Sequence, residues 1–588
     1  MDNQRLFLYI ALGFVSLLLY QSWVADYHTP AVRTPTEAAK ATGEGASTAA
    51  SDTPGGVAAS ADLPGTAAAD DAVAADAVDA TLAAPAVTVR TDVIDTTIST
   101  RGATITRVAL LDYPIDIDEP DVPLELMSNE PGRYMVLQSG LQSREGVAAP
   151  THREPYTVEA DSYVLADGED SLSVPFVWEG ANGVKVVKTL TFHRNSYQVE
   201  IDYRIQNASG ESWPVNQYRQ IKRKPATKDE RQQFMNTYIG GVLSTEDDTY
   251  DKIKFGDMQE ENLNREFVNG WVAMIQHYFA AALIPTEEGV ANTAYTRYLA
   301  DENRYLIGLV SASTVVPAGE EASFGTRAYI GPKIQDRLKA AAPNLELTVD
   351  FGWLTILSQP LFWLLKTIHG FIGNWGWAII LVTVIVKALF YKLSEASYKS
   401  MAKMRLLQPK LQALKERHGD DRAAMGQATM ALYKKEQVNP LGGCLPMLIQ
   451  IPVFIALYWA LLESVELRQA PWILWIRDLS VRDPYFILPV IMAITMFIQQ
   501  KLNPAPVDPI QQRVMQFLPL VFGVFFAMFP AGLVLYWVAN NTLTIAQQYY
   551  ITKYVVGDTP DPNRHKRSHG KENAGGKPTR SGRKKGKG

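Results

Sequence analysis

Cysteine is nearly absent from this sequence, which has a single one, Cys444, among its 588 residues. One cysteine excludes an intramolecular disulfide, a zinc site built on cysteines and thiol-pair redox chemistry. Motifs of common enzyme classes are missing too: there is no G-x-x-x-x-G-K-[ST] phosphate loop, no H-E-x-x-H metal pair and no G-x-S-x-G nucleophile elbow. We therefore expect no catalytic residues, no cofactor, no metal and no small-molecule substrate, and a protein that is not an enzyme.

Basic residues are missing between Lys40 and Arg90, and residues 29–86 are mostly Ala, Asp, Thr, Gly and Pro with almost no aromatics. Such a segment cannot bury enough apolar surface to offset the entropy lost on ordering. We therefore predict a flexible acidic linker over residues 26–88. The lack of lysine and arginine also suits a segment that is moved across a membrane.

The linker follows an apolar run, Leu6 to Ala25, that is long enough to cross a bilayer with about 20 residues. A cleaved signal peptide is the alternative. However, the run exceeds the apolar core of about 7–15 residues that is typical of such peptides, and bulky Trp23 stands where cleavage needs a small side chain. We predict a retained transmembrane anchor over residues 1–25.

Alternation of apolar and polar residues predicts strands in the next part of the chain. Residues 197–205 alternate strictly, residues 184–192 keep the same parity, and residues 193–196 join the two runs, which predicts a hairpin. His277 lies in an apolar and aromatic stretch, where a buried, hydrogen-bonded histidine is expected. Over residues 89–347 we predict one large all-β sandwich domain outside the cytoplasm.

After residue 347 the sequence becomes aromatic and apolar. Residues 348–370, interrupted by Pro360, predict an amphipathic helix that lies in the membrane interface. Five apolar stretches of about the length of a membrane span follow. They cover about residues 371–391, 444–463, 485–502, 514–530 and 532–551. With the anchor they give six spans, of which five form a helical bundle over residues 371–556.

The charges of the loops orient these spans. Residues 392–440 hold ten Lys and Arg against five Asp and Glu, and residues 563–588 hold ten basic residues against one acidic residue. Because basic loops remain in the cytoplasm, we predict a multi-pass inner-membrane protein with both termini cytoplasmic and about residues 26–350 outside. The tail, residues 557–588, is predicted to be disordered and suited to ribosomal RNA or anionic lipid.

A cytoplasmic helical hairpin is predicted over residues 392–438. Apolar residues from Met404 to Leu414 step by three and four positions, the spacing of a helical seam. A turn at residues 418–421 precedes a returning helix. The basic surface of this hairpin suits anionic lipid headgroups or the ribosome. Its candidate contact residues are Met404, Arg405, Lys410 and Lys415.

A few polar residues lie inside the predicted spans, where their cost demands a reason. Lys387 stands one helical turn after Thr383 and either reaches the cytoplasmic interface or faces the interior of the bundle. Asn540 and Asn541 near the middle of the last span either form interhelical hydrogen bonds or line a wet cavity. Gln450 adds a polar group on another helix. If these groups face one another, they enclose a hydrophilic groove.

Several long segments resemble the YidC/Oxa/Alb family of membrane protein insertases. They are residues 401–410, 439–454, 465–472 and 529–537, while residues 270–279 resemble the periplasmic domain of the family's Gram-negative branch. The resemblance covers nearly the whole chain except the linker and the tail. The alternatives are a polytopic transporter, for which the chain shows no convincing internal repeat, and a membrane-anchored periplasmic binding module.

The resemblance implies an insertase that moves nascent membrane proteins into the bacterial inner membrane, alone or with the Sec translocon. It implies a periplasmic β-supersandwich and a five-helix core with a groove open to cytoplasm and lipid. The family's groove cation, usually arginine, falls on Lys387, which keeps the charge without the guanidinium's fork of donors. The implied groove residues are Lys387, Thr383, Gln450, Phe454, Asn540, Tyr536 and Trp537.

Overall fold

The computed structural model describes residues 84–144, 147–226, 237–418, 421–436, 438, 445–503 and 509–555. The predicted anchor, nearly all of the acidic linker, the basic tail and Cys444 lie outside the described residues. The chain forms two compact units. The first reaches Phe362 and also includes Ala456–Val481, and the second comprises Trp363–Ile455 and the residues from Arg482 onward.

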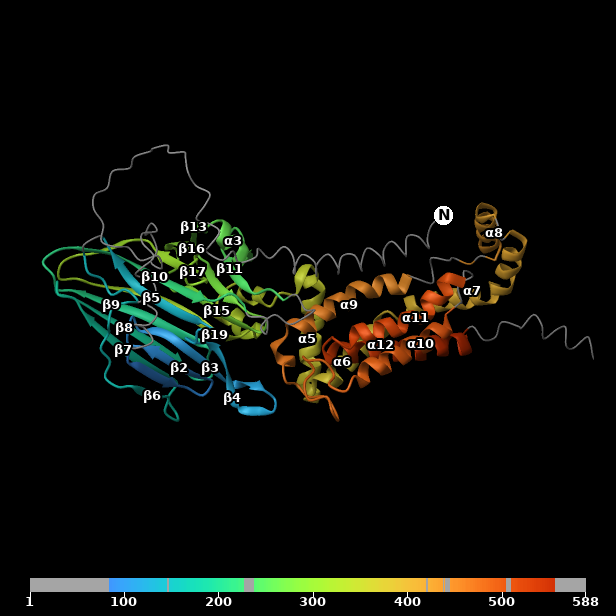
Figure 1. Ribbon diagram of the computed structural model, residues 1–588, viewed down its shortest axis with the longest axis horizontal. Coiled ribbons are helices and arrows are strands. Elements are labelled where there is room, and N and C mark those ends of the chain that lie inside the picture. Colours follow the sequence, from blue (N-terminus) through green and yellow to red (C-terminus); the bar gives the residue numbers. More distant parts are fainter. Residues whose placement is uncertain are drawn as a thin grey trace, which may run out of the picture. The chain divides into compact units, whose positions relative to one another are not determined.

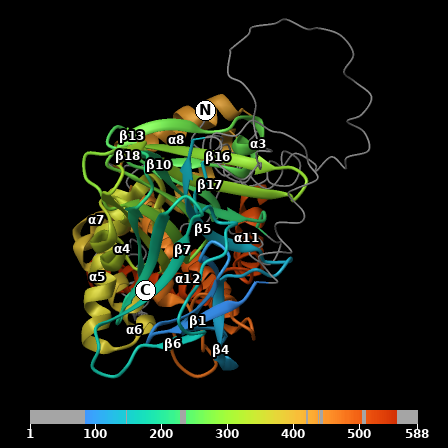
Figure 2. The same cartoon turned by 90° about the vertical axis from the view of Figure 1, so that its left-hand side faces the viewer.

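Most of the first unit is a domain of two sheets, here called the β-domain (residues 86–332; Figure 1 and Figure 2). One sheet has the strand order β13 (Asn264–Val268), β16 (Ala291–Leu299), β17 (Arg304–Ser311), β10 (Trp213–Arg223), β5 (Met135–Ser143), β3 (Thr104–Asp116), β2 (Ile94–Ser99), β1 (Ala86–Arg90) and β6 (Ser162–Val164), with β18 (Thr314–Val316) beside β10 and β4 (Glu119–Met127) beside β3. The other has the order β12 (Asp251–Ile253), β11 (Gly240–Ser244), β14 (Trp271–Ile275), β15 (Phe279–Pro285), β19 (Glu321–Pro332), β9 (Gln198–Asn207), β8 (Val184–His193) and β7 (Ser171–Glu179).

The predicted all-β domain and its hairpin are confirmed. β8 and β9 pair antiparallel, with Leu190 opposite Ile201 and Phe192 opposite Val199. Every second residue of β8 is buried, as expected for strands with one face against a second sheet. A hydrogen bond of 2.9 Å between the hydroxyl groups of Ser139 and Tyr203 joins the two sheets across the core.

One lysine is buried between the sheets. Lys188 on β8 is 1% exposed, and its Nζ donates to the carbonyl oxygens of Gly102, Ala103 and Ser139 at 2.7, 3.0 and 3.2 Å. Burial lowers the pKa of Lys188 to about 7, because the charged ammonium loses its hydration there.

Helices dominate the rest of the chain (Figure 1). Two short helices, α3 (Phe255–Glu260) and α4 (Gln335–Ala341), belong to the first unit, as do the 3-10 turns Leu345–Thr348, Gly352–Leu354 and Val465–Leu467. The longer helices are α5 (Thr355–Ile372), α6 (Trp375–Leu389), α7 (Tyr391–His418), α8 (Arg422–Lys435), α9 (Leu445–Glu463), α10 (Ile487–Leu502), α11 (Pro509–Phe526) and α12 (Ala531–Tyr550), which a π-helical turn, Ile551–Val555, extends. The residues of α5 and α9 fall in both units.

The expected interruption at Pro360 is wrong, because α5 continues through this residue. A proline inside a helix removes one backbone donor, and the helix accommodates that loss here. Ile356 and Trp363 on α5 are 87% and 66% exposed, respectively. The placement of this helix in a membrane interface stays a prediction.

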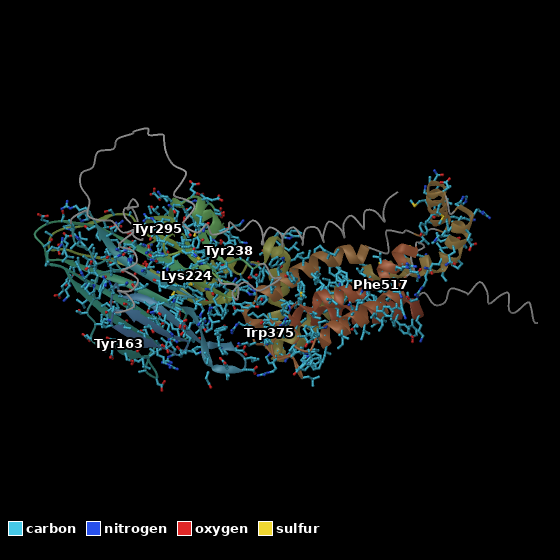
Figure 3. The ribbon with its side chains drawn as sticks, viewed as in Figure 1. Tyr163, Lys224, Tyr238, Tyr295, Trp375 and Phe517 are labelled. Carbon is cyan, nitrogen blue, oxygen red and sulfur yellow. The ribbon has the colours of Figure 1, made fainter. Side chains whose placement is uncertain are left out.

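Three close helix pairs organise the second unit. α10 packs against α11 and α12, and α12 packs against α6; the side chains of this unit are drawn in Figure 3, where Trp375 marks the start of α6 and Phe517 lies on α11. No single described helix is both long and apolar enough to cross a membrane, whereas α6 and α7 together meet that requirement and are bent by 70°. The number of spans therefore stays a prediction.

Candidate functional site

The site begins with one charged residue on an otherwise apolar helix. The side chain of Asn374 caps the start of α6 by accepting a hydrogen bond from the amide of Trp377. Lys387, in the last turn, is the only charged residue of α6, and a cation there complements the partial negative charge of the helix carboxyl end. The side chain of Lys387 is partly buried.

Lys387 links α6 to two other helices. Its Nζ donates to Oε1 of Gln450 on α9 at 3.2 Å and to Oγ1 of Thr544 on α12 at 2.8 Å. Within the described part of the chain, both hydrogen-bond partners of this ammonium group are neutral side chains. Thr544 was not predicted from the sequence, although it lies four residues after Asn540 and so on the same face of α12.

Gln450 continues the polar contact toward α12, because its Nε2 donates to Oδ1 of Asn540. The neighbouring Asn541 is 3% exposed and points to another helix, where its Nδ2 donates to Oγ1 of Thr495 on α10 at 3.4 Å. Both asparagines thus make interhelical hydrogen bonds, one of the two expected alternatives.

An aromatic cluster lies one helical turn from these amides. The ring of Phe454 stacks on Tyr536 with centroids 5.9 Å apart and meets Trp537 edge to face at 4.9 Å. Phe454 follows Gln450 by four residues, and Tyr536 precedes Asn540 by four. α9 and α12 therefore run antiparallel here, with an amide pair beside an aromatic pair on their facing sides.

Thr383 is the one candidate groove residue that does not reach this cluster. It is 2% exposed, and its hydroxyl donates to the carbonyl oxygen of Ile379 on its own helix at 2.7 Å. A threonine inside a helix commonly satisfies its hydroxyl in this way. Helical spacing places Thr383 on the same face as Lys387 but does not reveal this local bond.

The four residues predicted on the hairpin have different environments. Nη2 of Arg405 donates to the carbonyl oxygen of Lys501 at the carboxyl end of α10, at 2.6 Å. Lys410 on α7 forms an ion pair of 2.6 Å with Glu436, which follows α8, so the two helices are tied together. Met404 and Lys415 are partly buried.

Among the described residues, no group of three or more His, Cys, Asp or Glu could hold a metal ion.

Comparisons with known proteins match almost the entire chain. A family model described as the YidC periplasmic domain matches residues 86–364, and one described as 60Kd inner membrane protein matches residues 367–558. The chain is 50% identical to the membrane protein insertase YidC of Methylococcus capsulatus, covering 95% of this chain and 99% of the relative. It is 49% identical to that of Thioalkalivibrio sulfidiphilus, covering 94% and 99%.

A crystal structure of an active YidC insertase with its first transmembrane domain resolved is similar over 81% of this chain and 97% of that chain, at 18% identity and a TM-score of 0.36.

Proposed function

Because this chain belongs to the YidC family of membrane protein insertases, we propose that the cluster between α6, α9 and α12 is the groove that receives the incoming protein. The protein is an inner-membrane insertase that acts on nascent membrane proteins, and it is not an enzyme. The proposal concerns the location of the groove, the residues that line it and the partners that it serves.

The observation that carries the proposal is the pairing of Lys387 with neutral groups. Its ammonium group donates to an amide oxygen and a hydroxyl. A cation without a carboxylate partner is costly inside a membrane protein and marks a functional site by default. Lys387 therefore attracts acidic or polar residues in the part of the substrate that must cross the membrane.

The amide and aromatic pairs then act in sequence. Gln450 and Asn540 offer hydrogen bonds to the hydrophilic flank of the substrate, so that this flank does not meet the full hydrocarbon thickness. The apolar segment passes Phe454, Tyr536 and Trp537 into the lipid. Its own transfer free energy, about 25 cal/mol per Å² of apolar surface, drives that step.

The remaining assignments follow from loop charge and family resemblance. We propose six spans, cytoplasmic termini and a periplasmic segment over about residues 26–350. The hairpin and the basic tail would meet the ribosome or anionic lipids, and the Sec translocon would be a partner for some substrates. Arg405 and Lys410 already hold contacts with Lys501 and Glu436 within the protein.

Site-directed photocrosslinking tests the groove. A crosslinking amino acid is placed at Gln450, Tyr536 or Thr383, and a ribosome-stalled nascent membrane protein is added to inner-membrane vesicles. We expect strong crosslinks from Gln450 and Tyr536. Leu520 on α11, which is 64% exposed, is the matched control and should crosslink mainly to lipid. Equal crosslinking to the nascent chain from Leu520 and Gln450 would contradict the groove assignment.

A further inference from the structure

The segment 270–279, which carries part of the family resemblance, contributes none of the proposed groove residues. It forms β14, a short turn and the start of β15 in the β-domain. In that turn, Nε2 of His277 lies 2.9 Å from the carbonyl oxygen of Leu462, near the end of α9. Since a carbonyl oxygen only accepts, the Nε2 of this histidine carries the proton and donates.

The His277 side chain is held in one state. It is 7% exposed and stacks on the ring of Tyr278 with centroids 3.8 Å apart. Burial lowers the pKa of His277 to about 3, and the nearby charge of Lys333 acts in the same direction. The histidine is therefore neutral at ordinary pH, with one nitrogen committed to α9.

Glu463, the residue of α9 after Leu462, forms a buried ion pair with Lys333. Nζ of Lys333, directly after β19, is 3.3 Å from Oε2 of Glu463, and the two side chains are 1% and 4% exposed. The same Nζ donates to the carbonyl oxygen of Thr348 at 3.0 Å. Loss of either partner of such a pair is strongly destabilising, because it leaves an uncompensated buried charge.

The chain beyond α9 is attached to a third part of the β-domain. Nη2 of Arg468 donates to the carbonyl oxygen of Pro114 at the end of β3 at 2.7 Å, and Nε2 of Gln469 donates to the same oxygen at 3.1 Å. Arg477 pairs with Asp118, in the turn that joins β3 to β4, at 2.5 Å. All these residues belong to the first compact unit.

We propose that His277, Lys333 and Glu463, here called the α9 clamp, make the β-domain a fixed mount for the groove helix α9. The helix is continuous from Leu445 to Glu463 and carries Gln450 and Phe454. Whereas α6, α10, α11 and α12 form closely packed pairs, α9 meets α12 through the Gln450–Asn540 bond and the rings of Phe454 and Tyr536.

Fixing the carboxyl end of α9 fixes the rotation of this helix about its axis and its position along that axis. A rotation by one residue, about 100°, would turn Gln450 and Phe454 away from α12. The clamp residues are thus positioning residues for insertion, since they touch no substrate. This inference rests on the proposed groove, and it gives the β-domain a defined part in insertion.

Spin labels on α9 and α12 test the clamp in the full chain, reconstituted in lipid vesicles. Ile451→Cys and Thr542→Cys, in a Cys444→Ser background, report the distance between the two helices and its spread. Lys333→Met should broaden the distance distribution and lower the insertion rate roughly tenfold, because Glu463 is left buried without a partner. Lys339→Met, which removes an exposed lysine from the nearby α4, is the matched control and should leave both unchanged.

The double variant Lys333→Met/Glu463→Met separates positioning from general damage. Two apolar side chains fill the site without a buried charge, so both the distance distribution and the insertion rate should recover. Protection of β8 and β9 amides from hydrogen exchange should stay at the level of the unmodified chain in all variants. An unchanged distance distribution in Lys333→Met, or a double variant as defective as the single one, would overturn the clamp.

These outcomes are independent of the test of the groove. A wrong groove assignment appears as weak crosslinking from Gln450 and Tyr536 in the unmodified chain. A wrong clamp appears as unaltered label distances in Lys333→Met, whatever the crosslinking shows.

Discussion

Two lysines bond to the same helix, one from each compact unit, and their partners differ. Lys333 of the β-domain unit meets the carboxylate of Glu463 at the end of α9, at 3.3 Å. Lys387 of the helical unit meets the amide of Gln450, thirteen residues earlier on α9, at 3.2 Å. The two distances are similar, but Lys333 is neutralised by a carboxylate, whereas the partners of Lys387 in the described part of the chain are neutral.

This difference assigns the two lysines different roles: Lys333 fixes the end of α9, and Lys387 attracts the substrate. A buried lysine paired with a carboxylate gains nothing from a further acid, and breaking the pair costs about 3–5 kcal/mol. A lysine paired with neutral groups keeps most of its attraction for an incoming carboxylate, which a medium of low dielectric constant strengthens. α9 is thus held at one end and offers a receptive contact further along.

Reversing the charge of Lys387 should have the largest effect on insertion. We expect Lys387→Glu to lower the insertion of a substrate with an acidic translocated segment by roughly tenfold or more, a change of about 1.4 kcal/mol. Lys387→Arg should retain activity because the positive charge remains. Lys339→Glu, at an exposed position of α4 in the first unit, is the matched control. Insertion rates in vesicles measure the effect, and wild-type rates in Lys387→Glu would remove the charge from the mechanism.

Much of this arrangement could be predicted from the sequence where the pattern is local. The alternation in residues 184–205 predicts the hairpin of β8 and β9, because a strand with one buried face must alternate. Spacing alone left Lys387 between two environments, and the family resemblance rather than periodicity favoured the groove. The aromatic positions Tyr536 and Trp537 also came from the resemblance.

The clamp could not be predicted, because its contacts join distant parts of the chain. Lys333 and Glu463 are separated by 130 positions, and His277 and Leu462 by 185. Before the fold is known, Glu463 is only a charge at the end of an apolar stretch. The prediction of His277 as a buried, hydrogen-bonded histidine is confirmed, whereas its partner, a backbone carbonyl of α9, carries no residue-specific signal.

A single substitution can give Lys387 a carboxylate partner like that of Lys333. Gln450→Glu places a carboxylate beside Lys387, so the groove acquires an internal acid that competes with the substrate. We expect a roughly fivefold loss of insertion for acidic substrates, larger than the roughly threefold loss in the control Gln450→Leu, which removes only hydrogen bonds. Insertion rates that rank Gln450→Glu above Gln450→Leu would argue against an open cation.

The contact of His277 with the carbonyl oxygen of Leu462 should weaken at low pH. The pKa of His277 is lowered to about 3 from an ordinary value of 6.5, so this side chain binds fewer protons in the clamped state than in a released state between these values. The contribution of His277 to the stability of the clamp therefore falls as the pH drops below about 6.5, by about 2 kcal/mol at pH 5. Burial raises the pKa of Glu463, which acts in the opposite direction. Hydrogen exchange over residues 462–467, corrected for the intrinsic pH dependence, should rise between pH 7 and 5.

His277→Gln isolates the histidine, since glutamine also donates to the carbonyl of Leu462 but does not titrate. This variant should show little change in exchange between pH 7 and 5. His193→Gln is the control, because the side chain of His193 is 37% exposed in the β-domain. Persistent acid sensitivity in His277→Gln would assign the effect to another group.

Lys188 provides the smallest expected effect on insertion, namely none, and so sharpens the comparison. Among the residues that the structure describes, it too has no carboxylate partner: its Nζ donates to three backbone carbonyls between the sheets of the β-domain. Its pKa is lowered to about 7 from 10.5, so the native state binds fewer protons than the unfolded state between these values. The free energy of unfolding of the β-domain should therefore rise by about 2 kcal/mol from pH 7 to 9.

Urea unfolding of the full chain, followed by the fluorescence of its buried tryptophans, measures this rise. The variant Lys188→Met should remove the rise, while its insertion rate stays at the wild-type level. A loss of insertion in Lys188→Met would mean that a buried, unneutralised lysine matters wherever it lies, and not only beside α9.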